Sequence, residues 1–256
     1  RPLIAELNNY LGYKLSQQQK KALEIILTNK VTILTGGPGV GKTTLVQSIV
    51  RILQQLHRIL YLCAPTGKAA KRLKESTGAK ATTIHRALGV DPISKQFQHN
   101  TFNPLKTEFC IIDESSKIDI QLGNSLLKAI PNQACLLFVG DIDQLPSVGP
   151  GKLLRDLIET HRIAVVALTE IFRQAQTSLI IQHAHSIRQG TMPNFIIPED
   201  QPCDCYFIEK EESHDITETI RKLITERIPK KFRFNPIKDI QVLCPMHKGA
   251  HGTAAM

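Results

Sequence analysis

A glycine-rich segment near the N-terminus carries the residues with the clearest chemical purpose. Gly36-x-x-x-x-Gly41-Lys42-Thr43 matches a phosphate-binding loop, and it stands between an apolar run and a helical pattern. Glycines let backbone N–H groups approach phosphate oxygens, and a helix N-terminus adds positive partial charge. We therefore expect ATP here, with Lys42 on its β- and γ-phosphates and Thr43 on Mg²⁺. The expected nucleotide contacts are Gly37, Pro38, Gly39, Val40, Gly41, Lys42, Thr43 and Thr44.

Two carboxylates end a later apolar run, Phe109–Ile112. Asp113 is expected to hold Mg²⁺ through water, and Glu114 is expected to polarise the attacking water as a general base. After another apolar run, Gln144 stands where a polar group could sense the γ-phosphate. Arg173 is a candidate contact to the same phosphate, although an arginine after a strand is more often a salt-bridge partner.

A glutamine upstream of the loop offers a way to recognise the base. The amide of Gln19 both donates and accepts hydrogen bonds, so it could read the adenine edge. Ser16 is expected to cap the helix that carries it. The alternative interpretation is a run of solvent-facing glutamines.

A second group of residues suits a nucleic-acid backbone. Lys68 and Arg72 share one face of a predicted helix, and Thr66 and Gly67 precede it, so phosphates could bind at its start. Thr83 and His85 form a similar, less specific segment. The formal net charge of +9 favours a polyanionic partner. An exposed basic helix without a ligand is the alternative.

The arrangement of apolar runs predicts the fold class. Five short runs alternate with helical patterns, which indicates an α/β fold whose parallel sheet has helices on both faces. Ligands should then sit at the carboxyl ends of the strands. The runs are Val31–Leu34, Ile59–Ala64, Phe109–Ile112, Ala134–Val139 and Arg162–Leu168.

Composition changes divide the chain of 256 residues. We expect one domain over 1–88 and 107–190, with a small inserted hairpin at 89–106. Residues 191–256 should form a linker and an incomplete second α/β unit, with strands at Tyr206–Ile208 and Ile240–Cys244 around a helix at Ser213–Ile228. A further short helix is expected at Leu3–Leu11.

The cysteines and the hydropathy indicate a cytoplasmic protein. The six cysteines mostly adjoin apolar runs, as reduced, buried thiols do. No apolar run approaches the roughly 18 residues of a membrane span, and no signal peptide opens the chain. Cys203, Cys205, His247 and His251 lack the usual spacing of a zinc site.

The order of the motifs resembles the RecD-like DNA helicases of superfamily 1, group B. The resemblance covers nearly the whole chain, and it includes the opening of that family's second motor domain. The segments that carry it are Leu15–Ala22, Gly36–Thr44, Ala64–Ala70, Thr83–His85, Asp113–Ser116, Gly140–Gly149, Phe172–Gln174 and Val242–Gly249. Lys117 departs from the pattern, because these helicases usually have an apolar residue there.

The resemblance implies an ATP-hydrolysing, RecA-like motor that translocates 5′ to 3′ on single-stranded DNA and opens junctions with duplex DNA. Lys42, Glu114, Gln144 and Arg173 would carry catalysis, and residues 89–106 would be the small 1B pin. We also expect a role in DNA repair and recombination, and additional helicase or nuclease subunits are an open part of this expectation. Because the chain runs only from Arg1 to Met256, we expect a fragment with weak activity by itself. Alternatives are the helicase portion of a conjugative relaxase, another P-loop enzyme, and an ATP-gated binding protein.

Overall fold

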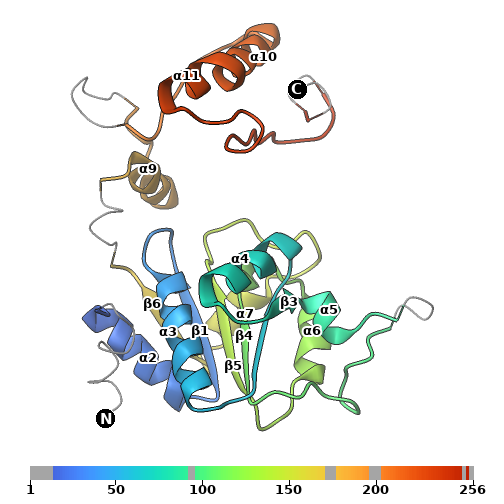
Figure 1. Ribbon diagram of the computed structural model, residues 1–256. Coiled ribbons are helices and arrows are strands. Elements are labelled where there is room, and N and C mark those ends of the chain that lie inside the picture. The colour runs from blue at the N-terminus through green and yellow to red at the C-terminus, as the bar shows by residue number, and fades with distance from the viewer. Residues whose placement is uncertain (1–13, 92–95, 171–176, 196–202, 250–251, 254–256) are drawn as a thin grey trace. The chain divides into compact units, whose positions relative to one another are not determined.

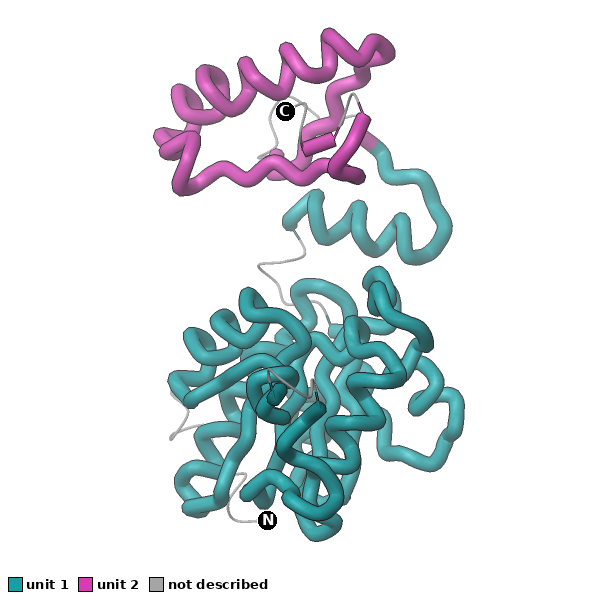
Figure 2. Tube along the Cα trace, turned by 90° about the vertical axis from the view of Figure 1, so that its right-hand side faces the viewer, with its two compact units in different colours: residues 1–194 teal, residues 195–256 magenta. Residues whose placement is uncertain are grey.

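The computed structural model describes residues 14–91, 96–170, 177–195, 203–249 and 252–253. The chain divides into two compact units, residues 1–194 and 195–256 (Figure 2). The expected helix at Leu3–Leu11 and the candidate Arg173 lie outside the described residues. Within the described part, no helix is both long and apolar enough to cross a membrane.

Unit 1 is built on a sheet of six parallel strands in the order β3-β2-β4-β5-β1-β6 (Figure 1). The parallel sheet confirms the expected fold class. The short β3 was not expected, because its three residues carry no apolar run to mark it. The strands are β1 (Val31–Gly36), β2 (Leu60–Ala64), β3 (Ala81–Thr83), β4 (Phe109–Ile112), β5 (Cys135–Gly140) and β6 (Ala164–Leu168).

Helices cover both faces of this sheet. Successive strand residues point to opposite faces, so Leu34 packs in the core under α2, α3 and α4, whereas Ile33 packs in the core under α5, α6 and α7. Unit 1 also contains α9 and the short 3-10 helix η1. These elements are α2 (Gln17–Thr28), α3 (Lys42–Gln55), α4 (Gly67–Thr77), α5 (Ile84–Leu88), η1 (Ser115–Lys117), α6 (Ile120–Ala129), α7 (Leu153–Glu159) and α9 (Leu179–Arg188).

The inserted segment at 89–106 is less regular than a hairpin. Its described residues contain one isolated antiparallel bridge, Val90 with Phe97, and no strand. Phe97 packs against the core and lies with its ring centroid 6.0 Å from that of His85. Phe102, in contrast, is 99% exposed. One of the two aromatic side chains therefore anchors the segment, and the other projects from it.

Unit 2 is organised around one long helical segment. It consists of α10 (Ser213–Lys222), a π-helical turn (Leu223–Arg227) and α11 (Ile228–Phe232). The strands expected at Tyr206–Ile208 and Ile240–Cys244 are wrong, since neither segment pairs with another described segment. A strand needs a neighbour to take its backbone hydrogen bonds, and an apolar run alone does not supply one.

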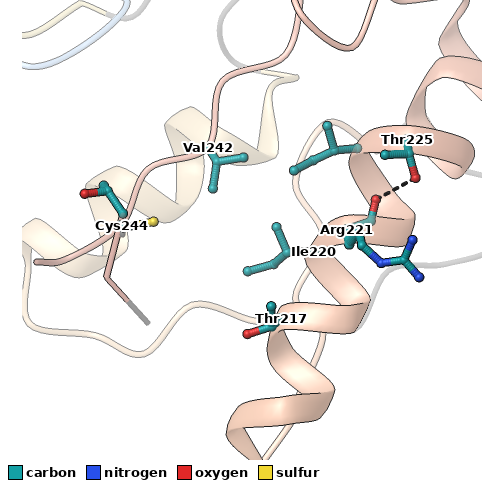
Figure 3. A pocket seen from close by; sticks show the side chains of 8 residues that line it. Thr217, Ile220, Arg221, Thr225, Val242 and Cys244 are labelled. Carbon is teal, nitrogen blue, oxygen red and sulfur yellow. Dashed lines mark hydrogen bonds between the residues drawn. The ribbon is translucent and has the colours of Figure 1, made fainter. Parts of the chain in front are cut away.

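A pocket of about 460 Å³ lies in unit 2 between α10 and the segment around Val242 and Cys244 (Figure 3). Ile220 and Thr217 of α10 face this segment across the pocket. Apolar side chains in the same part of the sequence are exposed to solvent, for example Leu243 (83% exposed) and Ile237 (91% exposed). The described apolar residues of unit 2 thus form no buried core comparable with that of unit 1.

Candidate nucleotide-binding site

The phosphate-binding loop joins the carboxyl end of β1 to the start of α3. Gly39 and Gly41 have φ values of 75° and 83°, in the left-handed region that favours glycine. Gly41 is the N-cap of α3, so the loop delivers its backbone N–H groups and Lys42 at the positive end of the helix. The Lys42 ammonium donates to the carbonyls of Gly36 and Gly37, the latter at 2.9 Å. Its side chain therefore folds back over the loop.

A cleft of about 890 Å³ opens around this loop. All eight predicted loop residues line it, together with Asp113, Glu114 and Gln144. Tertiary structure brings these distant segments together because β5 lies between β1 and β4, so their carboxyl ends meet at one edge. The remaining lining residues are Val46, Arg72, Leu73, Glu75, Ser76 and Val139.

The charges in the cleft influence one another. Burial lowers the pKa of the Lys42 ammonium, and the carboxylates of Asp141, Asp113 and Glu114 offset part of this effect. Asp141 is only 4% exposed and follows β5, just as Asp113 follows β4. Its place at the end of a buried run is a sequence signal that could have identified it, although we did not include it among the expected site residues.

Asp113 has the environment expected of a metal-binding carboxylate. Burial raises its pKa, whereas a hydrogen bond from the Glu114 N–H to its Oδ1 (2.9 Å) and the nearby Lys42 charge lower it. Burial penalises the ionised carboxylate, so a cation beside it would be favourable. Thr43 lines the same cleft, and its hydroxyl and the Asp113 carboxylate are oxygen donors of the kind that Mg²⁺ prefers.

Glu114 adopts an unusual backbone conformation. Its φ of 54° and ψ of 38° place it in the left-handed region, which is uncommon for a residue other than glycine. Its carboxylate forms an ion pair with Lys117 at 3.0 Å. Lys117 is the residue that departs from the family pattern. It is itself the ion-pair partner of Glu114, the expected general base.

Two neighbouring glutamines, Gln18 and Gln19, make different contacts. Gln19 is 2% exposed, and with Ser16 it forms a capping box in which its Oε1 accepts from the Ser16 N–H at 3.0 Å. The other end of its amide lies 3.5 Å from the Gly41 carbonyl, so the residue touches the phosphate-binding loop. Gln18 instead ties α2 to the end of β6 through Ala167 and Thr169. Adenine recognition by Gln19 stays a prediction.

The residues expected on the DNA path follow two neighbouring strands. Ala64 of β2 pairs with Thr83 of β3, so Thr66 and Thr83 stand near each other at the same sheet edge. Each hydroxyl caps a helix by accepting a backbone N–H, from Ala69 and Arg86 respectively. Gly67, Lys68 and His85 are exposed close to these caps. Arg72 is placed differently, because it lines the nucleotide cleft.

Helix α9 brings residues to the phosphate-binding loop that the sequence did not suggest. Arg188 forms an ion pair with Asp143 at 2.5 Å, and His185 lies beside Gly37 of the loop. No motif marks these residues, because they are far from the loop in the sequence and only the tertiary structure places them beside it. The described residues contain no group of three or more side chains that could hold a metal ion, and His251 lies outside them.

The parallel sheet and this cleft define a P-loop NTPase with a RecA-like fold. A family profile described as "AAA domain" matches residues 19–150. The chain therefore belongs to the AAA domain family, and among its homologues are RecD-type helicases.

Two curated relatives illustrate that similarity. The ATP-dependent RecD2 DNA helicase of Deinococcus radiodurans is 41% identical over 179 residues, which cover 70% of this chain and 24% of the relative. The RecBCD enzyme subunit RecD of Mycolicibacterium smegmatis is 38% identical over 167 residues, covering 56% of this chain and 30% of the relative. The matched region is thus about a quarter to a third of their length.

A solved structure shares the fold. The crystal structure of Pif1 helicase from Candida albicans superposes with a TM-score of 0.55 at 21% identity, covering 82% of this chain and 54% of that chain. At this identity the likeness shows the fold alone.

Proposed function

We propose that this chain is the nucleotide-binding portion of an ATP-dependent DNA helicase of the RecD type, which moves 5′ to 3′ on single-stranded DNA. One observation supports this most strongly. The phosphate-binding loop, the Asp113–Glu114 pair and Gln144 line a single cleft at one sheet edge. The names of the RecD-type relatives support the DNA-dependent activity, which belongs to the whole protein.

In this proposal ATP lies with its phosphates in the loop. Lys42 leaves the Gly36 and Gly37 carbonyls to contact the β- and γ-phosphates, and Thr43 and Asp113 hold Mg²⁺, which would neutralise phosphate charge. Glu114 polarises the attacking water, and Gln144 and Arg173 contact the γ-phosphate. Water adds to the γ-phosphorus, its proton passes to Glu114, and ADP leaves.

We place single-stranded DNA at the ends of β2 and β3. Thr66, Gly67, Lys68, Thr83 and His85 would meet the sugar–phosphate backbone there, which gives binding without sequence preference. Phe102 at 99% exposure supports a role for the inserted segment in separating strands at a junction. Arg72 could serve DNA or nucleotide, and its place in the cleft favours nucleotide.

Several finer assignments accompany this proposal. A role in repair and recombination with further subunits rests on the RecBCD names of relatives. A cytoplasmic location is consistent with six free cysteines. The helicase portion of a conjugative relaxase shares the same site chemistry and stays the alternative.

The decisive experiment measures ATP hydrolysis by the full-length protein with and without single-stranded DNA. We expect DNA to stimulate hydrolysis, Lys42→Ala to abolish nucleotide binding, and Glu114→Gln to stop hydrolysis while ATP still binds. Arg58→Ala is a matched control, because it removes an exposed arginine–carboxylate pair with Glu108 outside the cleft. If single-stranded DNA does not change the rate of ATP hydrolysis, the proposed DNA helicase function is rejected and another kind of P-loop enzyme is favoured.

A further inference from the structure

Helix α9 places two basic side chains against the phosphate-binding loop. A Cβ on Gly37 would stand 3.5 Å from His185 Cε1 and 3.6 Å from Arg188 Nη1. The two residues are three apart, so they share one face of α9. Burial lowers the pKa of Lys42, and the Arg188 charge adds a smaller contribution in the same direction. The Arg188 guanidinium therefore lies beside the loop that is expected to bind the negatively charged phosphates of ATP.

Arg188 forms an ion pair with an aspartate that lies next to the nucleotide cleft. Arg188 Nε contacts Asp143 Oδ2 at 2.5 Å, and Asp143 directly precedes Gln144, which lines the cleft. Both side chains are part-exposed, 39% for Arg188 and 34% for Asp143. Water can therefore solvate Asp143 if the guanidinium turns away, so an exchange of partners carries little desolvation cost.

His185 adds an independent observation at the same place. Its Nε2 atom is buried and has no hydrogen-bond partner among the described residues. A buried polar atom without a partner is costly, and natural structures rarely keep one unless something else binds it. The nitrogen lies 3.8 Å from the position of a Cβ on Gly37. The loop therefore faces an unsatisfied imidazole as well as an arginine.

We propose that Arg188 is a phosphate-contact residue that exchanges Asp143 for the terminal phosphate of bound ATP, with His185 beside it. The inference rests on the proposed nucleotide site and adds a contact from α9 to it. The terminal phosphate is favoured because Arg188 sits between Gly37 and the Asp143–Gln144 segment, whereas Gln19 touches the loop at Gly41. A planar guanidinium suits bidentate binding of phosphate oxygens.

The test compares binding of ATPγS and ADP, each with Mg²⁺, to the full chain by titration calorimetry. We expect Arg188→Ala to weaken ATPγS binding about tenfold and ADP binding less than about twofold, since a charged hydrogen bond to the terminal phosphate is lost. Asp143→Asn should tighten ATPγS binding about threefold, because it removes the competing anion. The double variant should behave like Arg188→Ala. Arg58→Ala, the exposed-pair control, should change neither.

The opposite signs of the two single variants separate this role from a structural one. If the ion pair only holds the loop in shape, both variants will weaken ATPγS binding, and the inference is overturned. Equal losses for ATPγS and ADP, or no loss in Arg188→Ala, overturn it too. Arg188→Gln removes the charge but keeps a polar side chain with the same carbon stem as far as Cδ, and thermal unfolding of each variant tests whether it still folds. If Lys42→Ala leaves binding unchanged, the proposed nucleotide site itself fails; if it abolishes binding, a negative result for Arg188 concerns this inference alone.

Discussion

Replacing Gly36 by alanine tests how closely the sheet supports the phosphate-binding loop. Gly36 has a φ of 154°, which side-chain-bearing residues rarely adopt. A Cβ there would stand 2.5 Å from the Leu168 carbonyl oxygen in β6 and 2.9 Å from Val40 Cγ2. The carbonyl belongs to the backbone of the paired strand, so it cannot move without disturbing the sheet.

The expected loss follows from these two effects. The strained backbone costs about 1–3 kcal/mol. Forcing an extra carbon into a packed site costs about 1–3 kcal/mol more. We therefore expect Gly36→Ala to lower the free energy of unfolding by about 2–6 kcal/mol, a large share of the roughly 5–15 kcal/mol of a typical domain. Gly36 is the last residue of β1 and leads into the phosphate-binding loop, so a backbone shift here should also weaken ATP binding.

Urea unfolding measures this loss through its midpoint and slope. The matched control is Gly67→Ala, where a Cβ meets nothing within 4 Å and where the residue starts α4. Alanine has a higher helix propensity than glycine. The free energy of unfolding of this control should therefore stay unchanged or rise by up to about 1 kcal/mol. An unchanged midpoint for Gly36→Ala would refute the close approach of β6 to the loop.

Three further predictions concern the cleft and the DNA path. Asp113→Asn should abolish Mg²⁺-dependent hydrolysis yet raise the free energy of unfolding by about 1 kcal/mol at neutral pH, measured by urea unfolding. Burial raises the pKa of Asp113 in the folded state above the ordinary aspartate value of 3.8. The gain in stability should therefore grow as pH rises above 3.8 and vanish below it, where the carboxyl is protonated in both the folded and the unfolded state. Lys117→Met should leave ATP binding intact and change the rate of hydrolysis more than its KM, because Lys117 pairs with the expected base Glu114; steady-state kinetics on the full-length protein decide this. Lys68→Ala should weaken single-stranded DNA binding for all sequences and reduce its salt dependence by about one ion, as fluorescence titrations at several salt concentrations would show; a salt-independent affinity would contradict the proposed path.

Local patterns were sufficient where the chemistry is carried by adjacent residues. The segment from Gly36 to Thr43 encodes its own loop, because its glycines permit the backbone and its lysine starts the helix. The capping box of Ser16 and Gln19 is likewise local. Continuous apolar runs predicted five of the six strands of unit 1, since a strand buried on both faces needs apolar side chains throughout.

Other features depend on contacts between segments far apart in the chain. The three residues of β3, an alanine and two threonines, become a strand because they pair with the edge of β2. The run Ile240–Cys244 forms no strand with another described segment, because none offers it such an edge.

The amino-acid sequence by itself determined the phosphate-binding loop and the parallel strands that lead to it, because both follow from neighbouring residue types. Only the tertiary structure decided that Arg188 meets Asp143 and that Arg72 enters the cleft. Both arginines lie on helices, and which residues a helical side chain meets depends on where the fold places that helix.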